Sequence, residues 1–308
     1  MGFVATEKKH RGYCDWGPRA ATQHWLDCVD EILTQYRSYW PLTIRQIFYR
    51  LVASYEYDKT EQAYGRLINY LGRARRSRMI PFNAIRDDGA ASRLPYVFES
   101  AGHWWANVHE DANSFQMDRL ADQDVRIEIF CEAEGMLPLI AQAVSEYTVP
   151  VYSGGGFNSL TSVRNCAGRA IEDPRDTLII NFGDYDPSGE SIFDSFRQDV
   201  WTFVAQATNR DKITFERAAL TSEQVEEMGL PTAPPKPTDS RSKNWVGETC
   251  QLEAIPPNDL ASLAVNMVSN SIDQDKYQAR RAMEDAIRDT LVDAIASAEQ
   301  KFNGGDDA

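Results

Sequence analysis

Acidic residues follow two of the apolar segments of this chain. The segment IINFGDYDPSGE runs from apolar residues into Asp184 and Asp186, and Glu132 directly follows the segment VRIEIFC. Carboxylate oxygens are ligands that Mg²⁺ takes in proteins, where it also keeps several waters. A helix that starts at Asp186, with Pro187 in its first turn, is an alternative for that residue, but it explains neither Asp184 nor Glu132. The pattern favours a Mg²⁺ site formed by Glu132, Asp184 and Asp186.

Tyr49 is a second candidate for chemistry. Thr43 and Gln46 have the spacing of a capping box, which predicts a helix that begins after Thr43. At about 100° per residue, the apolar residues of this helix fall on one arc. They are Ile44, Ile47, Phe48, Leu51 and Val52. Tyr49 lies outside this arc, with Arg45 one turn before it. Core packing therefore explains Tyr49 poorly, and both a tyrosine at the rim of the core and a reactive tyrosine remain open.

A second predicted helix begins near Thr60 and is rich in arginine. Its expected buried stripe consists of Tyr64, Leu67, Ile68 and Leu71. Arg66, Arg73 and Arg76 project from the other side, and Arg75 and Arg78 lie where the helix is expected to fray. The window from Gln62 to Arg86 contains six arginines and no acidic residue, whereas a solvated helix face usually carries both signs. These arginines are therefore candidates for contact with DNA.

The elements between residues 123 and 208 alternate between strand and helix patterns. VRIEIFC, VPVYS and TLIINF are predicted strands, and GMLPLIAQAVSEY and SLTSVRNCAGRAIED are predicted helices between them. This alternation predicts a parallel sheet, in which ligands bind beyond the carboxyl ends of the strands. Glu132 follows the first strand and the two aspartates follow the third. The turn SGGGFNS follows the second strand and makes Gly156 and Ser159 candidates for a phosphate-binding loop.

Composition narrows the class of protein. The chain has 308 residues, of which 43% are hydrophobic, and no run approaches the ~20 apolar residues that span a bilayer. Its net charge of -14 argues against indiscriminate nucleic-acid binding and makes the local concentration of arginines more informative. Five scattered cysteines without a CxxC pair argue against a zinc ribbon or a disulfide framework. His103 and His109 are expected to be packing or surface groups. We expect a cytoplasmic protein with no membrane segment.

The chain divides by pattern into three parts. Residues 18–95 are expected to form a helical, winged-helix-like DNA-binding domain. Residues 123–275 are expected to form the α/β domain with an extension, and residues 276–308 a C-terminal helix with a flexible tail.

These motifs together resemble those of the topoisomerase VI A-subunit family, which also includes the meiotic double-strand-break transesterase. The quoted stretches are LTIRQIFYRLV, IFCEAEG, SGGGFNS and FGDYDPSGE, and the resemblance covers residues from about 40 to 200. Members of this family place a winged-helix domain with an Arg-x-x-aromatic-Tyr motif before a Toprim domain. In many relatives lysine follows the Toprim glutamate, whereas here Ala133 and Glu134 follow Glu132.

The resemblance implies DNA transesterification. Tyr49 would attack a DNA phosphate to form a 5′-phosphotyrosyl link, Arg45 would orient that phosphate, and Glu132, Asp184 and Asp186 would hold Mg²⁺. It further implies double-stranded DNA as substrate, a homodimer that completes the site, and an ATPase subunit as a candidate partner.

Three other functions remain open. A Toprim hydrolytic nuclease would use a metal-activated water and leave Tyr49 structural. A non-catalytic DNA-binding protein would retain a relic site. A phosphatase-like or sugar-transferring enzyme with a DxD motif is disfavoured, because haloacid-dehalogenase-type phosphatases carry that motif on the first strand.

Overall fold

The computed structural model describes residues 13–86, 97–153, 160–208, 211–236, 241–242 and 245–304. The N-terminal part consists of helices α1 (Ala20–Gln35), α2 (Ile44–Tyr55) and α3 (Glu61–Arg76). Two short strands, β1 (Leu42–Thr43) and β2 (Ile85–Arg86), pair in parallel beside them. The specific winged-helix assignment goes beyond this description and stays a prediction.

The starts of α2 and α3 confirm two local predictions. Thr43 caps α2 in a complete capping box with Gln46, and the side chain of Thr60 accepts a hydrogen bond from the backbone of Ala63 at the start of α3. The expected buried stripe of α3 is wrong at Ile68, whose side chain is 44% exposed. Ala63, Leu67, Leu71 and Ala74 are the buried residues of this helix. The small side chains of Ala63 and Ala74 allow close packing, and Ile68 turns away from the core.

The larger sheet has four parallel strands in the order β4-β3-β5-β6. These are β3 (Val125–Cys131), β4 (Val151–Ser153), β5 (Asp176–Phe182) and β6 (Ile213–Ala219). The mixed α/β class and the three predicted parallel strands are confirmed. The sequence pattern did not predict β6, an edge strand that carries charged residues on its more exposed positions.

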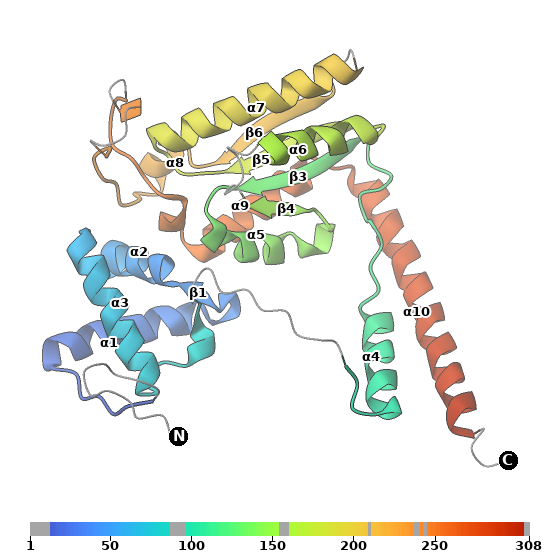
Figure 1. The fold of residues 1–308 in the computed structure, drawn as a ribbon, viewed down its shortest axis with the longest axis horizontal. Helices are drawn as coiled ribbons and strands as arrows, with labels where there is room; N and C mark the ends of the chain where they lie inside the picture. Colours follow the sequence, from blue (N-terminus) through green and yellow to red (C-terminus); the bar gives the residue numbers. More distant parts are fainter. Residues whose placement is uncertain are drawn as a thin grey trace, which may run out of the picture.

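Helices cover both faces of this sheet (Figure 1). On one face, α6 (Leu160–Glu172) and α7 (Pro187–Thr208) pack over Phe130 and Ile179. The other face packs on α5 (Leu137–Ala143) and α9 (Pro257–Asn270). This second core continues without a break into the N-terminal helices, so residues 13–86 and the sheet share one apolar interior.

The last long helix, α10 (Gln274–Gly304), leaves the sheet and runs beside α4 (Ala101–Asn113) to form a projecting arm (Figure 1). Near the end of the arm, Trp105 contacts Phe302 and His109 pairs with Glu299 at 2.6 Å. His103 contacts Phe98, so both histidines are packing or surface groups, as predicted. None of the described helices has a stretch long and apolar enough to cross a lipid bilayer.

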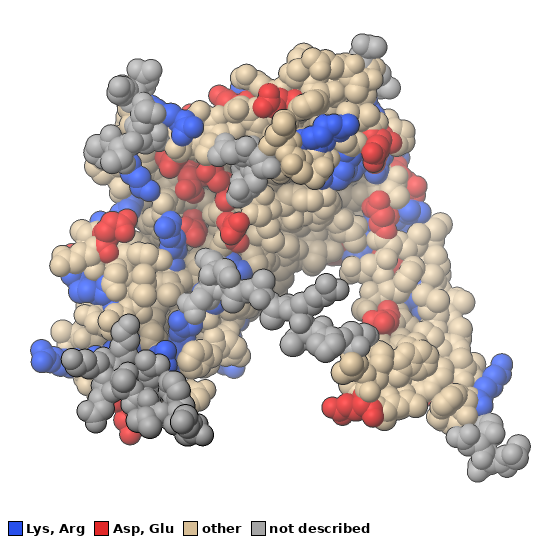
Figure 2. All heavy atoms as spheres, viewed as in Figure 1, with Lys and Arg blue, Asp and Glu red and all other residues tan. Residues whose placement is uncertain are grey.

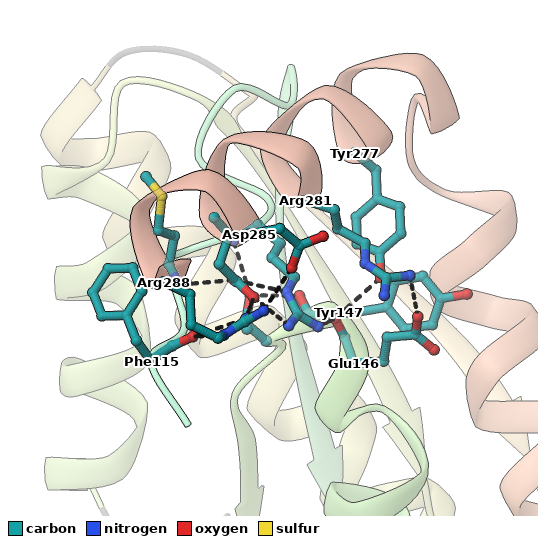
Figure 3. A network of polar contacts seen from close by, with 11 residues as sticks. Phe115, Glu146, Tyr147, Tyr277, Arg281, Asp285 and Arg288 are labelled. Atoms are coloured by element: carbon teal, nitrogen blue, oxygen red, sulfur yellow. Dashed lines mark hydrogen bonds and ion pairs between the residues drawn. The ribbon is translucent and has the colours of Figure 1, made fainter. Parts of the chain in front are cut away.

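The root of the arm is a buried network of charges (Figure 3). Glu284 of α10 is 1% exposed and accepts hydrogen bonds from Arg119 Nη2 at 2.6 Å and from the backbone of Met117 at 2.9 Å. Arg288 donates to Glu284 and to the carbonyl of Phe115. The network fastens α10 to the segment that connects α4 with β3.

Candidate functional site

The three predicted carboxylates lie at neighbouring strand ends, as expected for a parallel sheet. Cys131 pairs with Phe182, so Glu132 after β3 stands beside Gly183 after β5. A methyl group added to Gly189 would lie 3.0 Å from Glu132 Oε2 and 3.4 Å from Asp186 Oδ1. It would also lie 2.6 Å from the carbonyl oxygen of Asp184. A side chain would collide here, so glycine allows α7 to begin against the carboxylates. We call Glu132, Asp184 and Asp186 the strand-end site.

Backbone amides hold each carboxylate of the strand-end site. Glu132 Oε2 accepts from the amide of Asp184 at 3.2 Å, and Asp184 Oδ1 accepts from the amide of Leu252 at 2.8 Å. Asp186 Oδ1 accepts from the amide of Gly189 at 2.7 Å, as the side chain at the start of a helix does. Asp186 therefore caps α7, and its second oxygen keeps acceptor capacity for another group.

The strand-end site has more negative charge than its surroundings compensate. Burial, followed by the charge of Asp184, raises the pKa of Glu132 to about 7. Burial also raises the pKa of Asp184. Arg217 of β6 lies close to these carboxylates, but it donates to the backbone carbonyls of Asp184 and Leu220. A divalent cation would relieve the remaining repulsion.

The carboxylate oxygens of the strand-end site are of the kind that Mg²⁺ takes as ligands. Among the described residues, no group of three or more His, Cys, Asp and Glu side chains is arranged to hold a metal ion. Mg²⁺ is commonly bound through only one or two carboxylates and completes its shell with water, and Glu132 and Asp186 both border Gly189. Asn181 Oδ1 is buried without a donor among the described residues and lies beside Gly183, next to Glu132. Glu132 and Asp186 are therefore the two residues that could hold such an ion, whereas Asp184 is tied to Leu252.

Tyr49 is more buried than a tyrosine at the rim of the core, with 6% of its surface exposed. Its cover comes from the segment 250–254, far away in sequence. The hydroxyl of Tyr49 donates to Gln251 Oε1, and Arg45 Nη1 lies 3.4 Å from the same oxygen and 3.7 Å from Glu253. Burial, followed by the charge of Glu253, raises the pKa of Tyr49 well above its ordinary value, whereas Arg45 lowers it. The resting hydroxyl is therefore neutral.

The segment 250–254 joins Tyr49 to the strand-end site. Tyr185, inside the DxD motif, exchanges two backbone hydrogen bonds with Cys250, at 2.8 and 2.9 Å. The next residues bond alternately to the two regions: Gln251 to Tyr49, and Leu252 to Asp184. Arg50 of α2 donates to the carbonyl of Ala254. The segment 250–254 thus contacts both Tyr49 and the strand-end site.

A cavity of about 430 Å³ opens between these elements. Arg45, Tyr49 and Lys59 line it from the N-terminal helices, and Asp186 lines it from the start of α7. Figure 2 shows acidic side chains gathered near the strand ends, with basic side chains beside them, above the N-terminal helices. Of the predicted site residues, Arg45, Tyr49 and Asp186 therefore meet in this cavity, whereas Glu132 and Asp184 do not line it.

The five predicted arginines of α3 do not form one free face. Arg66 is exposed and lies 3.5 Å from Asp58. Arg73 packs over Trp16, Arg75 over Phe82 and Arg78 over Tyr13. The carbonyl of Arg76 accepts from the amide of Cys14. The side chains of Arg73 and Arg78 therefore hold the N-terminal segment against this part of the chain, and Arg66 and Arg78 are the exposed members of the predicted set.

Sequence reasoning missed three residues of this site: Arg217, Gln251 and Glu253. Arg217 belongs to the strand that the pattern did not predict. Gln251 and Glu253 lie more than 200 residues from their partners in α2, so no local pattern links them to that helix. The predicted phosphate loop with Gly156 and Ser159 lies outside the described residues.

Comparison with known proteins adds no relative: no protein family model, curated protein or solved structure matches this chain.

Proposed function

We propose that this protein is a Mg²⁺-dependent DNA-cleaving enzyme of the topoisomerase VI A type, with Tyr49 as the nucleophile. The observation that carries the proposal is the shared cavity, which Arg45 and Tyr49 of α2 line together with Asp186 of the DxD motif. A tyrosine in a purely structural role would not need an arginine one turn away and a carboxylate of the DxD motif in the same cavity.

In the proposed reaction, Tyr49 Oη forms a bond to phosphorus while the bond from phosphorus to the 3′ oxygen breaks. The phenol proton is lost and the departing 3′ oxygen gains one, so the reaction exchanges one phosphodiester for another without water. Arg45 is half exposed and can turn from Glu253 to a phosphate oxygen. Mg²⁺ held by Glu132 and Asp186 would stabilise negative charge on the phosphate oxygens.

Hydrolysis of DNA without a covalent intermediate is the second candidate, and the state of Tyr49 favours it. The raised pKa of Tyr49 opposes formation of the phenolate. In this reaction a water bound to Mg²⁺ would attack the phosphate, since the metal lowers the pKa of the water that it binds. In this alternative Tyr49 serves to hold Gln251 against α2.

The proposed partners differ in the observations that support them. Double-stranded DNA is the proposed substrate, with Arg66 and Arg78 as the exposed members of the predicted arginines. A homodimer, an ATPase partner subunit and a cytoplasmic location remain predictions from the resemblance. The cavity itself is formed within a single chain.

A Tyr49→Phe variant separates the two reactions. Supercoiled plasmid would be incubated with protein and Mg²⁺, stopped with denaturant, and analysed with and without protease. Transesterification predicts 5′ ends that stay attached to protein in the wild type and vanish in Tyr49→Phe. Tyr55→Phe is the matched control, since Tyr55 lies on the same helix but bonds to Glu31 at 2.8 Å.

The other outcomes decide between the alternatives. Free 5′ phosphates and full cleavage by Tyr49→Phe would establish hydrolysis instead. Asp186→Asn should abolish cleavage in both reactions. Cleavage that persists in Asp186→Asn at full rate would contradict the assigned metal site.

A further inference from the structure

Lys59 is a charged residue of the cavity that the proposed reaction does not use. It lies in the turn between α2 and α3 and lines the cavity beside Tyr49, with Nζ 5.6 Å from the centre of the Tyr49 ring. Its ammonium group donates to the carbonyl of Pro231 at 2.7 Å, which fixes the side chain along the cavity wall. An ammonium group has three donors, so this contact leaves capacity for a ligand.

No carboxylate within the described residues forms an ion pair with Lys59. Glu248 lies near enough to favour its charge, but Glu248 is exposed and accepts from Thr232. Burial lowers the pKa of Lys59, so the surrounding protein does not fully compensate the desolvated charge. Arg45, across the same cavity, already has Glu253 and Gln251 as partners. Lys236 also lines the cavity but is exposed, so Lys59 is the half-buried cation of this cavity that has no ion pair among the described residues.

We infer that Lys59 binds a phosphate group of the ligand that enters the Tyr49 cavity. Lysine binds phosphate as a point charge and needs no fixed fork geometry. The cavity supplies further positive charge from Arg45 and Lys236 and apolar walls from Phe48 and Pro234, a combination suited to a nucleotide unit. The phosphate could belong to a DNA strand or to a free nucleotide, and only the first source rests on the proposed function.

The test measures binding, so that it does not depend on cleavage. A fluorescent DNA duplex would be titrated with wild-type protein and with Lys59→Gln at several salt concentrations, without Mg²⁺, and binding would be followed by anisotropy. Lys59→Gln removes the charge but keeps a donor for Pro231. Lys59→Met serves as a second neutral variant, and Lys59→Arg tests whether charge alone restores binding. Inorganic phosphate and a deoxynucleoside monophosphate would be tested separately by thermal shift.

Lys276→Met is the matched control. Lys276 pairs with Asp124 at the start of α10 and does not line the cavity. The substitution changes the net charge by the same amount as Lys59→Met. A difference in DNA affinity between the two variants therefore shows that the position of the lysine matters.

We expect both neutral variants to bind DNA about tenfold more weakly and to lower the salt slope by about one, as loss of one phosphate contact does. Lys59→Arg should recover most of the affinity, and Lys276→Met should match the wild type. DNA binding that is unchanged in both neutral variants would overturn the inference and leave the proposed function in place.

If the wild type binds no DNA but binds phosphate or the nucleotide through Lys59, the inference stands and DNA as the substrate is wrong. Absence of all three kinds of binding would refute both.

Discussion

The strand-end site and the root of the arm both remove carboxylates from water, but they treat the charge in opposite ways. At the root of the arm, hydrogen bonds from Arg119, helped by those from Met117 and Arg288, lower the pKa of Glu284 to about 2. At the strand-end site, burial and neighbouring carboxylates raise the pKa of Glu132 to about 7. Arg217 is the positive charge that acts on Glu132, but its hydrogen bonds go to backbone carbonyls.

This difference separates two uses of buried charge. A carboxylate whose pKa is lowered by partners within the chain contributes to the stability of the fold. A carboxylate whose pKa is raised destabilises the fold when it ionises. A bound cation would remove this destabilisation. The root of the arm is thus complete within the described residues, whereas the strand-end site has the electrostatics of a binding site.

Neutralising the two glutamates gives the largest expected contrast. Glu284→Gln leaves Arg119, whose side chain is 8% exposed, without its buried counter-ion, and we expect a loss of about 3–5 kcal/mol in the free energy of unfolding. Glu132→Gln removes repulsion and keeps an acceptor for the amide of Asp184, so its effect without Mg²⁺ should stay within about 1 kcal/mol. Urea unfolding followed by circular dichroism measures both. Equal losses in the two variants would show that the two regions do not differ.

The pH dependence of stability sharpens the same comparison. The pKa of Glu284 in the folded protein, about 2, lies below the ordinary value of 4.5. Its stabilising contribution is therefore fully present above pH 4.5 and is lost as the pH falls towards 2. Linkage sets the loss at about 3 kcal/mol for a shift of this size.

The measurement is the difference in unfolding free energy between wild type and Glu284→Gln along this pH range. Taking the difference cancels Asp173, whose pKa is also lowered to about 2 and which titrates in the same window. A difference that stays constant from pH 5 to pH 2 would contradict the assignment.

Local patterns predicted much of the fold and part of the site. The capping box at Thr43 and the strands that precede Glu132 and Asp184 depend on residues a few positions apart, so their spacing could be interpreted without the rest of the chain. The position of Glu132 beside the residues that follow β5 was expected from the rule that parallel strands bring their carboxyl ends to one edge. Asp186 was predicted both as a cap and as a ligand, and the cap is confirmed by its contact with Gly189.

Contacts between distant segments account for what the sequence did not predict. The helical arc placed Tyr49 outside the core of α2, and the structure buries it because Gln251 covers it from 202 positions away. The arginines in and just after α3 were predicted to contact DNA because no acidic residue lies near them in the sequence. In the structure, three of them pack on aromatic rings. Trp16 and Tyr13, which supply two of those rings, lie in a segment without a periodic pattern.

Arg217 gives the smallest expected effect and the sharpest test of the strand-end site. Its guanidinium group lies close to Glu132, Asp184 and Asp186 but forms no ion pair with any of them. A fixed positive charge at this place repels an incoming cation. Arg217→Gln should therefore bind Mg²⁺ about tenfold more tightly, a change of about 1.4 kcal/mol, as measured by isothermal titration calorimetry.

Arg217→Lys separates charge from geometry in this experiment. Lysine keeps the positive charge but cannot reproduce the planar fork that donates to the carbonyls of Asp184 and Leu220. If repulsion controls the affinity, Arg217→Lys should bind Mg²⁺ as the wild type does, and only Arg217→Gln should bind it more tightly. If both variants bind more weakly, Arg217 acts by positioning the backbone of Asp184. The uncompensated charge of the strand-end site would then not be what attracts the ion.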